Sequence, residues 1–327
     1  MSQLDHSPRT LLRLDPWMPE YEGSVEIDSG GDGVTGDVDT TVETSEWRAV
    51  PSFPVAEVPP LYFIDGVQRT EARVLASREG TLIHGIFGTV AAGAVRSNLN
   101  LEQAVFDDCG VRRVLILGAG HNRSATMQAG NTSVTFEGIA SQATTPADLA
   151  SELRELMRQL EARIAESILG DSRIVFIDGP LAYISFLGPV VGVIKRISLP
   201  YLDSTHFALT TSLSLGERTP LFLISDGKRD RYSWYLRIGV GRSFDHVLAG
   251  VLRLEIRAAA GLEVARHLAG ISAAVLPRFA SLAARDPRAP QNLVPIGALE
   301  EELRRRMGHH LVIRRAIEKR ISQGVEL

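Results

Sequence analysis

Apolar residues recur at every third or fourth position between residues 145 and 170, which is the spacing of one face of an α-helix. This face contains Leu149, Leu153, Leu156, Leu160, Ile164 and Ile168. Thr145 followed by Pro146 is typical of a helix start, and Gly170 is typical of a helix end. The pattern therefore predicts one long amphipathic helix over residues 145–170.

The segments around this helix are short, apolar and rich in β-branched residues, which predicts strands. Before the helix we expect strands at 61–64, 111–119 and 132–141, with a hairpin or meander over 71–97. After the helix, strand-like segments lie at 173–178, 184–202, 220–225, 231–241 and 251–258, and helical patterns at 260–284 and 298–322. This order predicts an α/β fold in which helices flank a mixed sheet.

Two of the predicted strands end in the same four residues, Phe-Ile-Asp-Gly, at 63–66 and 176–179. An apolar strand that ends in Asp and Gly places a carboxylate where the sheet opens to solvent, and the glycine allows the chain to turn sharply. In open α/β sheets, ligands bind at such strand ends. Asp65 and Asp178 are therefore candidate ligands of one shared site; the alternative is a pair of ordinary Asp-Gly turns.

If carboxylates converge at this site, their chemistry favours a hard divalent cation. Oxygen-only ligands select Mg²⁺ or Mn²⁺ over zinc. Two such ions about 4 Å apart activate water and stabilise the leaving oxygen of a phosphodiester. Lys195, in a strand-like segment, is a candidate for a fixed positive charge that faces the attacked phosphate. The alternative for Lys195 is a solvent-facing position on an edge strand.

Other motifs argue against nucleotide chemistry. Gly118 and Gly120 follow a predicted strand, but Arg123 stands where a dinucleotide-binding fingerprint has its third glycine, and no helix pattern follows. The chain also has no glycine-rich loop of the kind that binds ATP phosphates. The basic segment 304–320 has two open interpretations: a helix along a phosphate backbone, or a charged face balanced by Glu300–Glu302.

Charge is unevenly distributed along the 327 residues. Nine carboxylates and no Lys or Arg occur between Glu20 and Glu46, so a chain of net charge −4 has about +5 outside this stretch. We interpret residues 20–47 as a mobile or peripheral segment, with a strand hairpin at the domain edge as the alternative. One cysteine, no apolar run of about 18 residues and no basic-then-apolar N-terminus together predict a cytoplasmic protein without membrane attachment.

Several short motifs, in this order, resemble the NurA nuclease family. They are YFIDG at 62–66, Arg158-x-x-Glu161, VFIDGPL at 175–181, VVGVIKRI at 190–197, YSWYLRIG at 232–239, LRLEI at 252–256 and PQNLVPIGAL at 290–299. The similarity extends over about 61–310. We therefore expect a variable acidic N-terminal segment at 1–55 and a NurA-like nuclease domain at 56–327.

The resemblance implies an RNase H-like core related to the nuclease domain of Argonaute proteins. It also implies a homodimer that requires Mn²⁺ (or Mg²⁺) and degrades DNA as an exo- or endonuclease. The expected partner is a hexameric HerA-type ATPase, in DNA end processing and repair or in phage defence. The family's metal carboxylates correspond to Asp65, Glu161 and Asp178; only the resemblance distinguishes Glu161 from the other glutamates of its helix.

Lys195 lies in one of the similar motifs and stays a catalytic candidate as a fixed positive charge, and we expect Arg69, Arg196 and Arg253 to contact nucleic acid. One departure stands out, because Gln291 and Leu299 occupy positions where the family has a tyrosine and a histidine. That departure motivates a second hypothesis, a catalytically weak docking subunit of a translocase complex. A third, an RNA-directed hydrolase on the same fold, stays open because no feature identifies discrimination of the 2′-hydroxyl.

Overall fold

The computed structural model describes residues 36–55, 57–78, 81–170, 173–184, 188–197, 200–227 and 229–323, which fold into two compact units. The first unit contains the described residues of Met1–Val55, with Ile194–Leu254 and Leu262–Val294. The second contains Ala56–Val193, Glu255–Gly261 and Pro295–Leu327.

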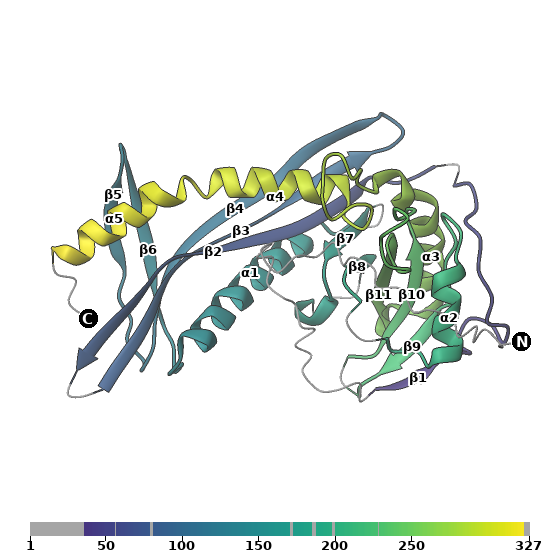
Figure 1. Ribbon diagram of the computed structural model, residues 1–327, viewed down its shortest axis with the longest axis horizontal. Coiled ribbons are helices and arrows are strands. Elements are labelled where there is room, and N and C mark those ends of the chain that lie inside the picture. The colour runs from purple at the N-terminus through teal and green to yellow at the C-terminus, as the bar shows by residue number, and fades with distance from the viewer. Residues whose placement is uncertain are drawn as a thin grey trace, which may run out of the picture. The chain divides into compact units, whose positions relative to one another are not determined.

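The second unit is built on a mixed sheet with the strand order β8-β7-β2-β3-β4-β6-β5 (Figure 1). Pairing is antiparallel for β2 with β3, β3 with β4, and β5 with β6, and parallel for β2 with β7, β7 with β8, and β4 with β6. The predicted mixed sheet is therefore confirmed. The strands are β2 (Leu61–Arg78), β3 (Thr81–Asn98), β4 (Gln103–Leu117), β5 (Ala125–Ala129), β6 (Thr132–Ala140), β7 (Ile174–Asp178) and β8 (Val190–Ile194).

The helices of this unit begin and end close to their sequence signals. Helix α1 (Pro146–Ile168) is capped by Thr145, whose side chain accepts a hydrogen bond from the backbone N–H of Asp148. The predicted helix 298–322 is two helices, α4 (Val294–Arg306) and α5 (His310–Ser322), separated where Gly308 has a φ of +84°. Short 3₁₀ turns occupy Leu181–Tyr183 and Ala258–Ala260. Among the described residues, no helix is both long and apolar enough to cross a membrane.

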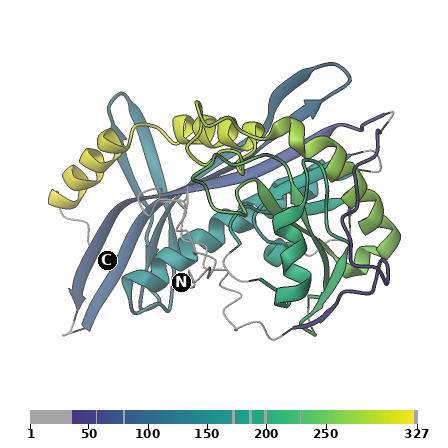
Figure 2. The ribbon, with the colours of Figure 1, turned by 45° about the vertical axis from the view of Figure 1, so that its right-hand side comes forward.

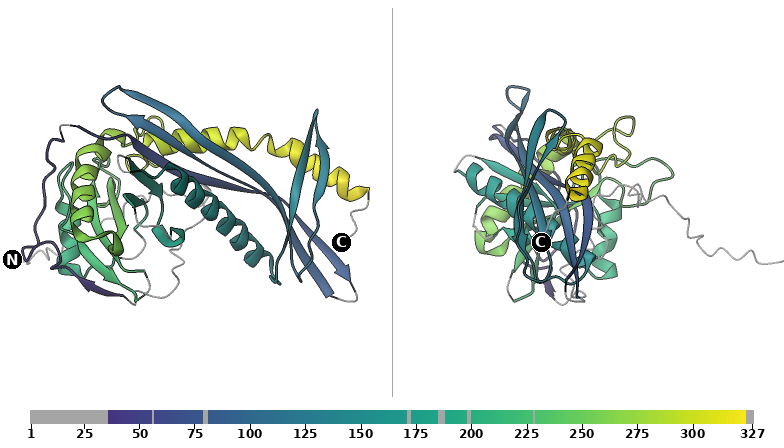
Figure 3. Two further views of the ribbon diagram at one scale, coloured as in Figure 1. Left: turned by 180° about the vertical axis from the view of Figure 1, so that it is seen from behind. Right: turned by 90° about the vertical axis from the view of Figure 1, so that its left-hand side faces the viewer.

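Helices α1 and α5 pack on opposite faces of this sheet. Val114 and Ile116 of β4 belong to the core cluster that includes α1, whereas Leu115 and Leu117 belong to the cluster that includes α5. Because successive side chains of a strand point to opposite faces, these two clusters lie on the two sides of the sheet. All views agree that α4 and α5 run beside the long strands β2 and β3 (Figures 2 and 3).

The first unit is a smaller α/β assembly with the strand order β1-β9-β10-β11. Its strands are β1 (Asp37–Asp39), β9 (Phe222–Ser225), β10 (Arg231–Arg237) and β11 (Val251–Arg257), the last of which ends in the second unit. Its helices are α2 (Ser204–Ser212), α3 (Leu262–Val275) and the 3₁₀ turn Leu276–Phe279. No helix is predicted at α2, and the helix predicted over 260–284 is shorter than expected, because α3 ends at Val275.

The described end of the acidic segment is an edge strand of the first unit. Strand β1 pairs antiparallel with β9, and the Glu43 carboxylate accepts hydrogen bonds from both terminal nitrogens of Arg218, at 2.8 and 2.7 Å. For these residues the edge position of the alternative interpretation is confirmed, but the expected hairpin is wrong, because β1 pairs with the distant strand β9. The rest of the segment, residues 20–35, lies outside the described residues.

Candidate metal centre

The two copies of Phe-Ile-Asp-Gly lie side by side in the sheet of the second unit. Strands β2 and β7 are parallel neighbours, and their register pairs Phe63 with Phe176 and Ile64 with Ile177. The two phenylalanine rings stack, with their centroids 5.4 Å apart. The next residue on each strand is an aspartate, so Asp65 and Asp178 occupy equivalent positions and face the same side of the sheet.

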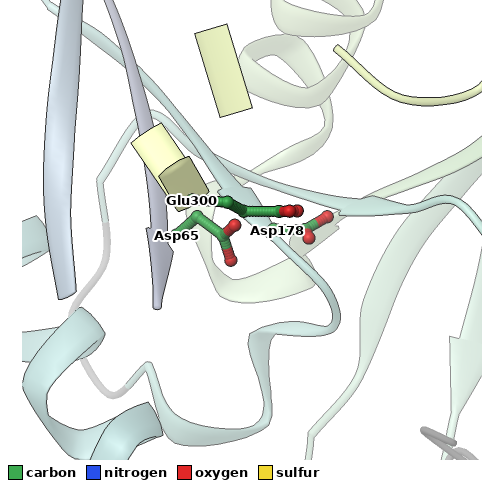
Figure 4. Close-up of side chains that lie close together, drawn as sticks. All are labelled: Asp65, Asp178 and Glu300. Carbon is green, nitrogen blue, oxygen red and sulfur yellow. The ribbon is translucent and has the colours of Figure 1, made fainter. Parts of the chain in front are cut away.

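A third carboxylate reaches this pair from helix α4. One oxygen from each of Asp65, Asp178 and Glu300 lies within 4.8 Å of the other two, and Figure 4 shows the three side chains converging. Asp65 and Glu300 are only 5% and 7% exposed, and Asp178 is partly buried. The site therefore combines two strands and a helix that are far apart in the sequence.

Glu161 lies next to these carboxylates but does not belong to the group within 4.8 Å. It is 2% exposed, and its Oε2 accepts a hydrogen bond from Arg158 Nη1 at 3.0 Å. The same Arg158 atom donates to the backbone carbonyl of Asp178 at 2.9 Å, which ties α1 to the end of β7. Glu161 Oε1 is buried and has no hydrogen-bond partner among the described residues. The role of Glu161 as a metal ligand stays a prediction.

Burial raises the pKa of Glu161, and the negative charge of Asp178 adds to that rise, while Arg158 opposes it. A buried carboxyl group next to another carboxylate is costly to ionise unless a positive charge comes close. The Glu161 Oε1 without a partner and the raised pKa therefore both indicate that Arg158 alone does not balance the negative charge of these carboxylates.

The two glycines of the repeat, Gly66 and Gly179, have different structural roles. Gly179 has a φ of +93° and turns the chain after β7, as the sequence predicts. Gly66 lies inside β2, so the prediction that this strand ends at residue 64 is wrong. A Cβ at Gly66 would lie 2.6 Å from Glu161 Oε1 and 2.9 Å from Met157 Cγ. Gly66 is needed because α1 approaches the strand closely at this point.

The donor set fits a hard divalent cation. Asp65, Asp178 and Glu300 offer only carboxylate oxygens, which match Mg²⁺ or Mn²⁺ better than zinc. Three carboxylates this close repel one another, and a cation between them relieves that repulsion.

The sequence contained a signal for Glu300 that motif comparison missed. Residues Ile296, Leu299 and Leu303 form the buried stripe of α4, and each is fully buried. Glu300 follows Ile296 by four positions, so the helical repeat places its carboxylate on the same buried face. A glutamate inside an apolar stripe is uncommon unless it has a partner, and that pattern identifies it as a candidate ligand.

Comparison with known proteins identifies the family. The family model described as the NurA domain matches residues 59–297, which is most of the chain. This chain belongs to the NurA family. The NurA nuclease from Sulfolobus solfataricus is a similar solved structure, at 11% identity and a TM-score of 0.47, over 86% of this chain and 88% of that one. The catalytic domain of human Endonuclease V matches at 15% identity and a TM-score of 0.33, over 77% of this chain and 85% of that one. No curated protein matches the sequence.

The lysine of the NurA-like motifs lies in the first unit and is buried. Lys195 is 5% exposed, so the alternative of a solvent-facing lysine is wrong. Its Nζ donates a hydrogen bond to Asn292 Oδ1 at 2.8 Å, and Asn292 Nδ2 donates to Asp286 Oδ2 at 2.6 Å. Gln291 donates from Nε2 to the backbone carbonyl of Lys195 at 2.9 Å. The role of Lys195 toward a phosphate stays a prediction.

The three arginines expected to contact nucleic acid have different surroundings. Arg69 is held by the Glu71 carboxylate, with an Nη2–Oε1 distance of 2.8 Å. Arg253 is 3% exposed, and its guanidinium lies 4.8 Å from the centroid of the Tyr201 ring. Arg196 is exposed. Contact of each with DNA stays a prediction.

Proposed function

We propose that this NurA-family chain is a metal-dependent DNA nuclease that uses Mn²⁺ or Mg²⁺. The observation that carries the proposal is the register of β2 with β7, which places Asp65 beside Asp178, together with Glu300 from α4. We also propose an RNase H-like core. The strand order β4-β3-β2-β7-β8 supports it, because three antiparallel strands continue through α1 into parallel strands on the other side of β2.

Asp65, Asp178 and Glu300 would hold the cation, and Glu161 is the fourth carboxylate available to it. When bound, such a cation activates water and neutralises charge that develops on a phosphodiester. The chain's own residues hold the site in shape. The Phe63–Phe176 stack fixes the two strands two residues before the aspartates. Arg158 fixes both the Asp178 backbone and the Glu161 carboxylate.

In this proposal Lys195 contributes a positive charge that stabilises the attacked phosphate. Its bond to Asn292 restricts where the ammonium group points. A group oriented before the reaction loses less entropy when it acts, which favours catalysis. The basic residues Arg69, Arg196 and Arg253 are proposed to contact the DNA.

The proposed assembly follows from family membership. We propose a homodimer in the cytoplasm that works with a hexameric HerA-type ATPase in DNA end processing or phage defence. The rival hypothesis, a docking subunit with little activity, arose from Gln291 and Leu299. Leu299 lies in the core of α4, but the next residue, Glu300, brings a carboxylate to the site. This observation favours the enzyme over the docking subunit.

The test is cleavage of labelled DNA by the purified chain. Single- and double-stranded DNA, and matching RNA, are incubated with Mn²⁺, with Mg²⁺ or with EDTA, using wild type, Asp178→Asn and the exposed control Asp230→Asn. We expect cleavage of DNA only with metal, near-complete loss in Asp178→Asn and full activity in Asp230→Asn. Cleavage in EDTA, or undiminished cleavage by Asp178→Asn, contradicts the proposal. Cleavage that appears only after a HerA-type partner is added, and that Asp178→Asn does not diminish, supports the docking hypothesis.

A further inference from the structure

A second buried carboxylate, Glu71, lies on the same strand as Asp65. It is fully buried and lies where a register shift between Thr70 and Ala72 interrupts the pairing of β2 with β3. Its Oε1 accepts hydrogen bonds from Arg69 Nη2 at 2.8 Å and from Thr89 Oγ1 at 2.6 Å. Its Oε2 lies 2.9 Å from Nδ1 of His310, the first residue of α5. Glu71 therefore connects two central strands to the C-terminal helices.

The same cluster holds the C-terminal end of α4. The backbone carbonyl of Met307 accepts hydrogen bonds from Arg113 Nη2 at 3.0 Å and from Arg69 Nη2 at 3.5 Å. The last carbonyls of a helix have no partner within the helix and carry its partial negative charge, so two guanidinium groups at this point are favourable. The buried Glu71 carboxylate in turn balances the charge of the partly buried Arg69.

Helix α4 connects this cluster to the candidate metal centre. Glu300 and Met307 are seven residues apart, which is about two turns or 10 Å along a helix. Because an α-helix is stiff over two turns, a shift at Met307 moves Glu300 as well. Helix α5 packs on the sheet through the apolar residues Ile313 and Ile317, and apolar contacts alone do not fix where the helix lies along the strands. The hydrogen bonds of the polar cluster are directional and fix this position.

We propose that Glu71, Arg69, Arg113 and His310 form a positioning cluster that fixes α4 and so places Glu300 in the metal centre. None of the four belongs to the group of converging carboxylates; they act through the helix. Binding of the cation and docking of α4 and α5 are therefore coupled, and the coupling acts in both directions. The inference rests on the proposed metal centre, but not on DNA cleavage.

The test measures Mn²⁺ binding to the full chain by calorimetry. We expect Glu71→Gln, which is isosteric but cannot balance Arg69, to weaken Mn²⁺ binding by about 10-fold or more, as loss of a group that orients a ligand does. Two adjacent histidines provide a matched pair: His310→Ala, which removes a contact to Glu71, weakens binding, and His309→Ala, which removes an exposed side chain, does not.

Hydrogen exchange measures the coupling in the other direction, from Mn²⁺ binding to the docking of α4 and α5. If the cluster only stabilised the fold, Mn²⁺ would not change the exchange rates of these helices. We expect Mn²⁺ to slow amide exchange in α4 and α5 of the wild type and to have no such effect in Glu300→Gln. If Glu71→Gln and His310→Ala are folded and bind Mn²⁺ as the wild type does, the coupling is wrong. Equal protection of α5 by Mn²⁺ in Glu300→Gln also overturns it. A wild type that binds no Mn²⁺ contradicts the metal centre itself, and the coupling with it.

Discussion

Asp65 and Asp178 occupy equivalent positions on neighbouring parallel strands, one residue beyond the Ile64–Ile177 pair. The repeated tetrapeptide is therefore a structural pair, because the same residues meet across β2 and β7. Phenylalanine stacks on phenylalanine beneath the site, and each aspartate presents its carboxylate to the same face. Glu300 is the third carboxylate of the group, and it comes from helix α4, which does not contain the repeated tetrapeptide.

Removing one aspartate should abolish stabilisation of the protein by metal. A cation that binds only the folded state stabilises it by about 2.7 kcal/mol at 100 times its Kd. We expect thermal unfolding of the wild type to shift upward in Mn²⁺ and that of Asp65→Asn to shift little. Without metal, Asp65→Asn should be at least as stable as the wild type, since one repulsion is removed. An equal shift in both proteins contradicts the assignment.

The phenylalanine stack should be a major source of stability in the second unit. Phe63 and Phe176 are fully buried, and truncation of a buried phenylalanine costs about 3–5 kcal/mol. We expect Phe176→Ala to lower the free energy of unfolding by this amount in urea denaturation, whereas Phe53→Ala, at an exposed position, should have almost no effect. A loss below about 1 kcal/mol in Phe176→Ala would show that the strands do not rely on this contact.

A methyl group added at Gly66 should disturb the packing of α1, and with it Glu161, against β2. The added Cβ would fall 2.6 Å from Glu161 Oε1 and 2.9 Å from Met157 Cγ, so these side chains, or the helix that carries them, must move away. We expect Gly66→Ala to cost about 1–3 kcal/mol of stability, the usual cost of overpacking, and to weaken Mn²⁺ binding. The control is Gly270→Ala, because a Cβ there meets nothing within 4 Å. Equal behaviour of the two variants would refute the close packing of Glu161 against β2.

Lys195 and Asn292 should affect catalysis without affecting the metal. Loss of a fixed charge that stabilises a transition state typically costs 100- to 1,000-fold in kcat. We expect a loss of about this size in Lys195→Met, a smaller loss in Asn292→Leu, and unchanged Mn²⁺ affinity in both. Single-turnover cleavage separates the chemical step from binding. A change only in KM would assign Lys195 to binding of the substrate.

Low pH should weaken the ion pair between Glu43 and Arg218, which holds the described N-terminal segment on the first unit. Burial raises the pKa of Glu43, but hydrogen bonds and charge from Arg218 outweigh it, so the net pKa lies below the usual 4.5. The ion pair therefore contributes fully above about pH 4.5, and its contribution is lost as the pH falls through the lower pKa of the folded state. We expect Glu43→Gln to lose about 1–2 kcal/mol at pH 7 and to differ less from the wild type near pH 3. A constant difference across this range contradicts the pairing.

The sequence predicts which helices and strands occur in this fold better than it predicts their lengths or the contacts between them. The period of α1 and its Thr145 cap are local signals, and both agree with the structure. The continuation of β2 past Asp65 is not a local property, because Gly66 is required by the packing of α1 rather than by a turn. Helix α2 is not predictable from its sequence, STHFALTTS, because that sequence has almost no amphipathic period.

The candidate site was only partly predictable for a similar reason. The repeat identifies Asp65 and Asp178, since identical residues at the ends of two apolar strands are visible without a structure. Glu300 is brought to them by the packing of α4, and its sequence neighbours suggest an ordinary charged surface. Its one local signal is its place in the buried stripe between Ile296 and Leu303.

Anomalous diffraction from crystals soaked in Mn²⁺ tests the central claim most directly. We predict a peak between Asp65, Asp178 and Glu300, with carboxylate oxygens in the range of about 2.0–2.6 Å that hard cations adopt, and no peak at this position in Asp178→Asn. A fully occupied Mn²⁺ ion elsewhere in the chain, with this position empty, would contradict the account.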